Sequence, residues 1–112
     1  MMMMEFSIFP VGTGESLSAA VARALRLVRE SGLPHEITDM GTIVEGTPRD
    51  CLRLVERCIR LLAKDHGRLS CSVKIDYRRG AAGRLGRKSR KVRSIVRRLE
   101  SAGRSHGGTE HR

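Results

Sequence analysis

Hydrophobic and polar residues alternate along several short stretches of the chain, and a period of two predicts β-strands. The clearest alternation covers residues 69–77, where Leu, Cys, Val, Ile and Tyr take the odd positions and polar residues take the even ones. Residues 5–9 alternate as well, and Pro10 follows them directly. We expect a strand in each range, and we expect the strand at 69–77 to bury one face and expose the other.

Two further short strands are predicted at residues 35–39 and 42–45. Met40 and Gly41 join them, and glycine permits a tight reversal of the chain. We therefore expect these two strands to form a β-hairpin.

Apolar residues recur at intervals of three and four in two longer stretches, which predicts two amphipathic helices. The first follows Ser16, a residue type that caps helices, and stops before Gly32. The second follows Thr47 as N-cap, starts with Pro48 and is expected to end at Gly67. The expected buried residues are Leu17, Val21, Ala24, Leu25 and Val28 in the first helix, and Cys51, Leu52, Val55, Cys58, Ile59 and Leu62 in the second.

The resulting order, βαββαβ, is that of a ferredoxin-like α+β sandwich, a four-stranded antiparallel sheet with two helices on one face. A short C-terminal amphipathic helix is expected at residues 88–99. These elements divide the chain into three parts. We expect residues 1–78 to form the ferredoxin-like domain, residues 79–100 to form a basic linker and a helix that packs on the domain or a neighbouring subunit, and residues 101–112 to form a disordered tail.

The formal net charge of +10 comes from the C-terminal part of the chain. Residues 1–77 hold ten Lys and Arg against ten Asp and Glu, whereas residues 78–112 hold twelve against two. Such a tail could bind phosphate groups, so RNA association through the tail is the alternative functional hypothesis. The predicted sheet argues against an RNA-recognition domain, because those domains stack bases on aromatic residues of their central strands.

The three cysteines, Cys51, Cys58 and Cys71, are an odd number without the spacing of metal ligands. We interpret them as reduced core thiols, which is typical of cytoplasmic proteins. No stretch has the ~20 apolar residues of a membrane span, so we expect no contact with membranes. The opening run of four methionines lacks the apolar segment of a signal peptide, and we attribute it to an ambiguous start codon rather than to structure.

Period-two geometry places many polar strand residues on the sheet face opposite the helices. These residues are Ser7, Thr38, Glu45, Ser72, Lys74 and Asp76. An antiparallel sheet can simply expose such a face to water. An ion pair with Lys74 is then the structural explanation for Glu45, and β-propensity is the structural explanation for Thr42.

Three sequence strings give these residues a more specific interpretation. The strings are Phe9-Pro10-Val11-Gly12-Thr13, Asp39-Met40-Gly41-Thr42-Ile43-Val44-Glu45-Gly46 and Val73-Lys74-Ile75-Asp76-Tyr77-Arg78-Arg79. The residue types of these strings and their spacing resemble those of the thiamine-binding protein family, which is related to the YkoF-like domains. The resemblance covers roughly residues 4–100. Two features depart from the family pattern: Tyr77 stands where many members have an acidic residue, and the tail is more basic.

The resemblance implies a non-catalytic domain that assembles into dimers or tetramers and binds thiamine or its hydroxymethylpyrimidine moiety. It implies ligand contacts from the hairpin and from the loop after the first strand. The candidates are Met40, Thr42 and Glu45, then Gly12, Thr13 and Thr38, and more weakly Lys74 and Asp76. A carboxylate and a hydroxyl could bond the ring nitrogen and the exocyclic amine of an aminopyrimidine.

The sequence gives little support for an enzyme. It has no Ser/His/Asp or Cys/His arrangement, no metal cluster and no phosphate-cradling loop, since Gly12-Thr13-Gly14 is too short for a nucleotide signature. We therefore expect no catalytic residue, no metal ligand and no cofactor. The sequence leaves open whether the ligand is thiamine, its pyrimidine fragment or another small heterocycle, and whether the assembly is a dimer or a tetramer.

Overall fold

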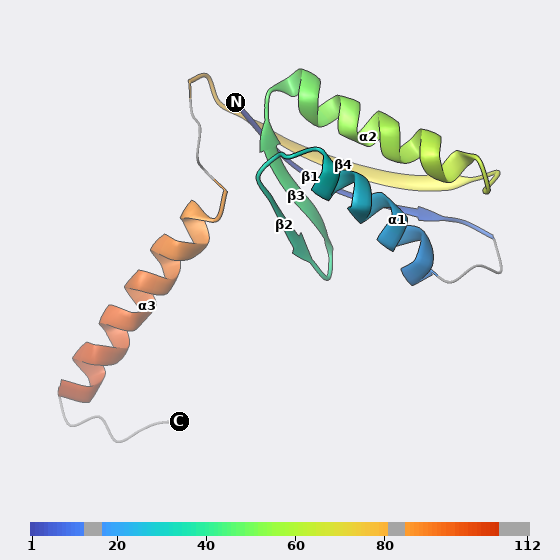
Figure 1. Cartoon of the computed structure of the whole chain (residues 1–112). Helices are drawn as coiled ribbons and strands as arrows, with labels where there is room; N and C mark the ends of the chain where they lie inside the picture. The colour runs from blue at the N-terminus through green and yellow to red at the C-terminus, as the bar shows by residue number, and fades with distance from the viewer. Residues whose placement is uncertain (13–16, 81–84, 106–112) are drawn as a thin grey trace.

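The computed structural model describes residues 1–12, 17–80 and 85–105 of the chain. Its elements in chain order are β1 (Met2–Pro10), α1 (Leu17–Glu30), β2 (His35–Thr38), β3 (Gly41–Gly46), α2 (Pro48–Ala63), β4 (Leu69–Tyr77) and α3 (Arg87–Ser105). Figure 1 shows them coloured along the chain. The first six elements follow the predicted βαββαβ order, which confirms the ferredoxin-like α+β fold.

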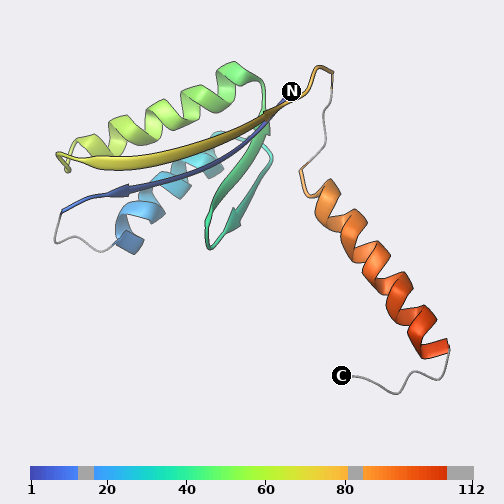
Figure 2. The ribbon, with the colours of Figure 1, turned by 180° about the vertical axis from the view of Figure 1, so that it is seen from behind.

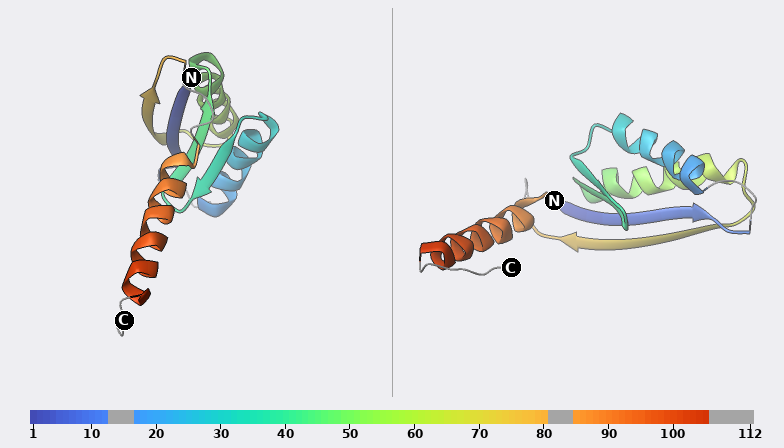
Figure 3. Two further views of the ribbon diagram at one scale, coloured as in Figure 1. Left: turned by 90° about the vertical axis from the view of Figure 1, so that its left-hand side faces the viewer. Right: turned by 90° about the horizontal axis from the view of Figure 1, so that it is seen from below.

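The four strands form one antiparallel sheet in the order β2-β3-β1-β4. Helices α1 and α2 cover one face and leave the other open, as the right-hand view of Figure 3 shows. We call these faces the helix face and the open face. Polar Ser7, Glu45 and Lys74 lie on the open face, as the period of two predicted.

The opening methionines are part of the fold, so their attribution to an ambiguous start codon rather than to structure was wrong. Met2 and Met4 alternate with exposed or half-buried neighbours in β1 and are buried under the helices beside Phe6 and Ile8. The N-terminal ammonium of Met1 also donates a hydrogen bond to the carbonyl of Arg78 at 2.9 Å, which ties the start of β1 to the end of β4.

Helix α1 packs through small residues. Ala20, Ala24 and Val28 are buried, whereas the predicted core residues Leu17 and Val21 are exposed. Small side chains let α1 approach α2 closely, and the Cys58 thiol lies 3.8 Å from the carbonyl oxygen of Ala24. The expected cap, Ser16, lies outside the described residues.

Helix α2 begins as predicted. The Thr47 hydroxyl accepts a hydrogen bond from the Asp50 backbone N–H at 3.1 Å, and Pro48 occupies the first turn. The helix ends at Ala63, before the predicted Gly67.

The buried face of α2 is rotated from the predicted one. Leu54 is buried, whereas Leu52 and Ile59 are 50% and 39% exposed. The full buried set is Cys51, Leu54, Val55, Cys58 and Leu62. The sequence misplaced this face because apolar residues on α2 extend beyond the stripe that the sheet and α1 cover.

The hairpin is confirmed, but its reversal lies at Asp39 and Met40 rather than at Met40 and Gly41. Gly41 belongs to β3, and its φ is not positive. A Cβ atom at this position would lie 3.0 Å from the backbone oxygen of Phe6 in β1. Glycine is therefore required here by the close approach of two strands and not by the turn.

Strand β4 is an edge strand that is covered over its first part. Leu69 and Cys71 are partly buried, but Val73, Ile75 and Tyr77 are 42%, 47% and 57% exposed. These three residues lie on the helix face beside Phe6, Met4 and Met2 of β1, yet they stay exposed. The prediction that this whole face would be buried was therefore wrong, because alternation indicates a side and not what covers it.

Helix α3 extends away from the sheet and the other two helices (Figures 1 and 2). Its apolar stripe, Val92, Ile95, Val96 and Leu99, is exposed. The helix continues to Ser105, which is inside the range expected to be disordered, and residues 106–112 lie outside the described residues. None of the helices in the described ranges combines the length and the apolar character needed to cross a bilayer.

Candidate ligand-binding site

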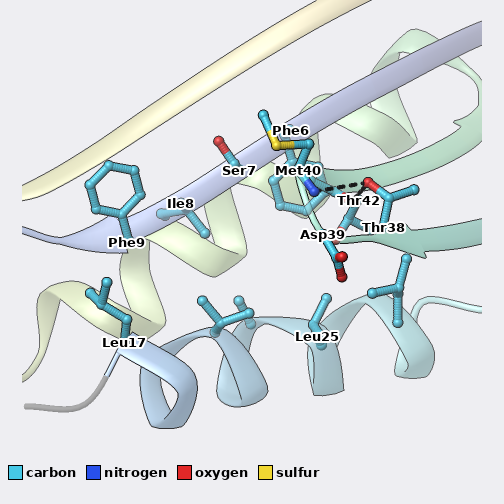
Figure 4. Close-up of a pocket in the computed structure, with 14 residues that line it drawn as sticks. Phe6, Ser7, Ile8, Phe9, Leu17, Leu25, Thr38, Asp39, Met40 and Thr42 are labelled. Carbon is cyan, nitrogen blue, oxygen red and sulfur yellow. Dashed lines mark hydrogen bonds between the residues drawn. The ribbon is translucent and has the colours of Figure 1, made fainter.

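A cavity of about 350 Å³ lies between α1 and the β2–β3 hairpin, on the helix face of the sheet (Figure 4). This volume is at the small end of the range for small-molecule sites. Most of the lining is apolar and comes from β1 and α1. The principal apolar residues are Phe6, Ile8, Phe9, Leu17, Val21, Leu25 and Ile37.

Residues of α1 that the sequence assigned to the core line this cavity. Leu17, Val21 and Leu25 follow one another at intervals of four and therefore share one face of the helix. Because the neighbouring positions Ala20 and Ala24 make the close contacts of the helix, the larger side chains border open space.

The polar groups of the cavity gather near the hairpin. Figure 4 shows Thr38, Asp39 and Thr42 at one end, while Phe9 and Leu17 lie at the other. This arrangement gives the cavity an apolar end and a polar end.

Thr42 contributes the most buried hydroxyl of this polar end. The residue is 5% exposed and lies opposite Phe6 and Ile37 in the sheet. The residue lines the cavity beside Asp39 and Met40. A threonine hydroxyl can act as both donor and acceptor of hydrogen bonds.

Thr38 has a structural role in the turn. Its hydroxyl accepts a hydrogen bond from the Met40 backbone N–H at 3.2 Å and donates one to the Gly41 carbonyl at 2.9 Å. These bonds hold Asp39 at the end of the hairpin, where its exposed carboxylate lines the cavity. Met40 is 84% exposed and lines the cavity beside Asp39.

Glu45 does not share this cavity. It lies on the open face, is 2% exposed, and accepts a hydrogen bond from the Leu85 backbone N–H at 3.2 Å. It lines a separate cavity of about 400 Å³ with Met1, Leu33, Pro34, Gly46, Thr47, Asp50 and Leu85. The carboxylate is thus sheltered, but it lies on the other side of the sheet from Thr42.

The remaining predicted contacts are dispersed. Lys74 lies opposite Glu5 in the sheet and lines a shallow hollow of the open face that Met40 also reaches. Asp76 is exposed, with its carboxylate 3.9 Å from the Arg78 guanidinium. Gly12 follows β1 with a φ of 72°, and Thr13 lies outside the described residues.

The cysteines are free, as predicted, and they do not form a reactive centre. Burial, with a smaller contribution from Cys71, raises the pKa of the Cys58 thiol to about 11. Burial also raises the pKa of Cys51 and of Cys71. Among the residues that the structure describes, no group of three His, Cys, Asp or Glu could hold a metal ion.

The family follows from a comparison with models of known protein families. The model for "thiamine-binding protein" matches residues 4–93, which include most of β1, the other three strands, α1, α2 and the start of α3. The chain belongs to the thiamine-binding protein family.

Proteins with sequences similar to this thiamine-binding family member are known from bacteria and archaea. UPF0045 protein Mb1933 of Mycobacterium bovis is 34% identical over 96 residues, which cover 85% of this chain and 94% of that protein. The crystal structure of the hypothetical protein MJ1052 of Methanocaldococcus jannaschii has 30% identity and a TM-score of 0.73. It covers 81% of this chain and 94% of its own.

A third similarity concerns the fold of the family member. A proposed thiamine biosynthesis/salvage protein of Thermotoga maritima has a TM-score of 0.72 at 22% identity, covering 81% of this chain and 97% of its own. At that identity, the comparison shows a shared fold.

The hairpin string, residues 39–46, contributes to both cavities. Asp39, Met40 and Thr42 line the cavity beside α1, and Glu45 lines the other cavity.

Sequence reasoning missed part of the site of this thiamine-binding family member. Asp39 is in the hairpin string, but it was not selected because the end of a predicted strand gave no reason to expect a cavity there. Leu17, Val21 and Leu25 were expected in the core, because the same apolar periodicity describes residues that pack together and residues that line an apolar cavity.

Proposed function

We propose that this protein binds thiamine or its hydroxymethylpyrimidine moiety, without catalysing a reaction, in the cavity between α1 and the hairpin. One observation carries the proposal: an apolar cavity of ligand size contains the buried Thr42 hydroxyl and the Asp39 carboxylate at the same end. Membership of the thiamine-binding protein family supports the same ligand class.

The chemistry of the cavity suits an aminopyrimidine. The flat ring would lie between the apolar side chains of β1 and α1, where Phe6 offers an aromatic surface. The Asp39 carboxylate would accept a hydrogen bond from the exocyclic amine, and the Thr42 hydroxyl would donate one to a ring nitrogen. With intact thiamine, the cationic thiazolium would extend toward the exposed side of the cavity.

In this proposal, Glu45 has a structural role. Its carboxylate accepts a hydrogen bond from the Leu85 N–H, immediately before α3. A negative charge near the N-terminus of a helix is also favourable for the helix dipole. Glu45 would thus fix the position at which α3 leaves the domain. The cavity that Glu45 lines is the alternative location for the ligand.

The proposal includes a cytoplasmic homo-oligomer. Helix α3 exposes Val92, Ile95, Val96 and Leu99, an apolar stripe that is too small to stabilise an isolated helix in water. The stripe would be covered by the domain or by a neighbouring subunit.

RNA association through the C-terminal part is the second candidate function. One observation favours it: Arg90, Lys91, Arg93, Arg97 and Arg98 of α3 are all exposed, and α3 extends from the domain. Filter binding of single-stranded RNA by the full chain at increasing salt tests it. Arg97→Glu with Arg98→Glu would lower affinity and flatten the salt dependence, and unchanged binding would reject this function.

Isothermal titration calorimetry of the purified full-length protein tests the main function. We expect saturable binding of thiamine and of hydroxymethylpyrimidine, and no binding of the isolated hydroxyethylthiazole. The thiazole is the matched control because it lacks the aminopyrimidine that Asp39 and Thr42 would bond. Absence of heat with both pyrimidine ligands, in a folded sample, would reject the function.

A further inference from the structure

Asp39 brings a negative charge to the cavity beside α1. Among the lining residues that the structure describes, it is the one with an ionisable side chain. Figure 4 shows its carboxylate at the hairpin end of the cavity, between the hairpin and α1. A ligand that enters this end therefore meets a charge of known sign.

The hairpin turn holds Asp39 in place. Thr38 pairs with Gly41 where β2 and β3 end. The Thr38 hydroxyl also accepts a hydrogen bond from the Met40 N–H and donates one to the Gly41 carbonyl. Because the backbone is constrained on both sides of Asp39, its carboxylate is presented to the cavity from a fixed position.

The arginines of α1 are paired elsewhere or lie outside the cavity lining. Arg23 Nη1 lies 2.6 Å from the Asp65 carboxylate, and Arg26 Nε lies 3.1 Å from the Glu30 carboxylate. Arg29 is exposed and does not belong to the lining. The carboxylate of the hairpin therefore sets the electrostatic potential inside the cavity, and the apolar walls strengthen its effect because they exclude water.

The chemistry of the ligand places a second group close to this carboxylate. In hydroxymethylpyrimidine, the exocyclic amine and the hydroxymethyl group are attached to neighbouring ring carbons. If the amine donates a hydrogen bond to Asp39 over about 2.9 Å, the substituent on the neighbouring carbon lies within about 6 Å of the same carboxylate.

Three related compounds differ in the charge of that substituent. Thiamine carries its thiazolium cation there, and the free alcohol is neutral. The phosphate ester of the alcohol carries a charge of about −1.5 to −2 at pH 7. The Asp39 carboxylate would therefore attract the first substituent and repel the third.

We propose that Asp39 determines the specificity of the cavity by the charge of this substituent, so that affinity falls from the cation to the neutral alcohol to the anion. This inference rests on the proposed function, because it requires an aminopyrimidine in the cavity beside α1. Thr42 and the apolar walls contact the ring in all three compounds and do not discriminate among them.

Thiamine phosphate distinguishes this selection from a general exclusion of anions. Its phosphate is attached to the far end of the thiazolium, several bonds further from the carboxylate and toward the exposed side of the cavity. Water and salt would screen the phosphate there, so thiamine phosphate should bind within about threefold of thiamine.

Isothermal titration calorimetry of the full-length protein at one fixed salt concentration tests the selection. The phosphate ester of hydroxymethylpyrimidine should bind at least about a hundredfold more weakly than the alcohol. Asp39→Asn keeps an oxygen that can accept from the amine but removes the charge. This variant should raise the dissociation constant of thiamine and lower that of the phosphate ester, each about tenfold.

Glu36→Gln is the matched control. It removes the same charge from the same hairpin, but Glu36 is exposed on the open face, in line with Glu5 and Lys74. The affinity ratios of the three compounds should stay as in the wild type. A change equal to that of Asp39→Asn would overturn the inference, because the net charge of the protein would then be responsible.

Two further results would overturn the inference and leave the proposed function intact. The first is binding of the alcohol and of its phosphate ester with equal affinity. The second is an Asp39→Asn variant that unfolds thermally like the wild type and excludes the ester as strongly, since the exclusion would then be steric. Absence of binding by both thiamine and hydroxymethylpyrimidine would instead reject the proposed function, and this inference with it.

Discussion

Thr42 and Glu45 lie three residues apart on β3, and their side chains occupy opposite faces of the sheet. Thr42 faces the helices and lines the cavity beside α1, whereas Glu45 faces the open side and bonds the backbone before α3. A single small ligand in either cavity would contact one of them and not the other. In the proposed function, Thr42 is therefore the residue of this pair that contacts the ligand, and Glu45 has a structural role.

Gly41→Ala is expected to destabilise the protein by about 1–3 kcal/mol, because a Cβ there would lie 3.0 Å from the backbone oxygen of Phe6. Urea unfolding followed by circular dichroism measures the change. Gly67→Ala is the matched control, since a Cβ at that position has no atom within 4 Å and its φ is not positive. Equal stability of the two variants would show that β1 does not approach Gly41 so closely.

The buried Cys58 thiol predicts a loss of stability at alkaline pH. Burial raises its pKa from 9.0 to about 11, so between those pH values the folded state holds a proton that the unfolded state has released. The free energy of unfolding contributed by this group should therefore fall as the pH rises through this window. Urea unfolding at several pH values measures the fall, and Cys58→Ala should reduce the slope. An unchanged slope would contradict the origin assigned to it.

Val96→Asp in α3 is expected to shift the assembly to smaller species, because a charge in the exposed apolar stripe prevents its burial against a neighbour. Analytical ultracentrifugation measures the mass distribution. Arg93→Asp is the matched control, since it introduces the same residue on the polar side of the same helix. If both variants keep the wild-type distribution, α3 does not contribute to the assembly.

The sequence predicted the elements of the domain well, because caps and periodicities are local features. Thr47 and Pro48 marked the start of α2 correctly, and the hairpin formed where alternation indicated it. The buried face of α2 was misplaced since Leu52, Leu54 and Ile59 surround the helix, and neighbouring elements decide which of them is covered.

The site was less predictable than the fold. The alternation of β4 correctly placed Val73 and Ile75 on the helix face, but α2 leaves them exposed. On β3, the same alternation implied that Thr42 and Glu45 face opposite sides, although the family resemblance grouped them. A cavity depends on which side chains are small where two elements cross, as at Ala20 and Ala24, and one sequence does not reveal that crossing.

The most direct test of the ligand site compares hydroxymethylpyrimidine binding by Thr42→Val and by Glu45→Gln in calorimetric titrations. Thr42→Val removes one hydroxyl at nearly constant volume and should raise the dissociation constant about tenfold, the value of one hydrogen bond. Glu45→Gln should bind like the wild type, because Glu45 lines the other cavity. Loss of binding in Glu45→Gln with unchanged binding in Thr42→Val, both variants being folded, would contradict the account and move the ligand to the cavity that Glu45 lines.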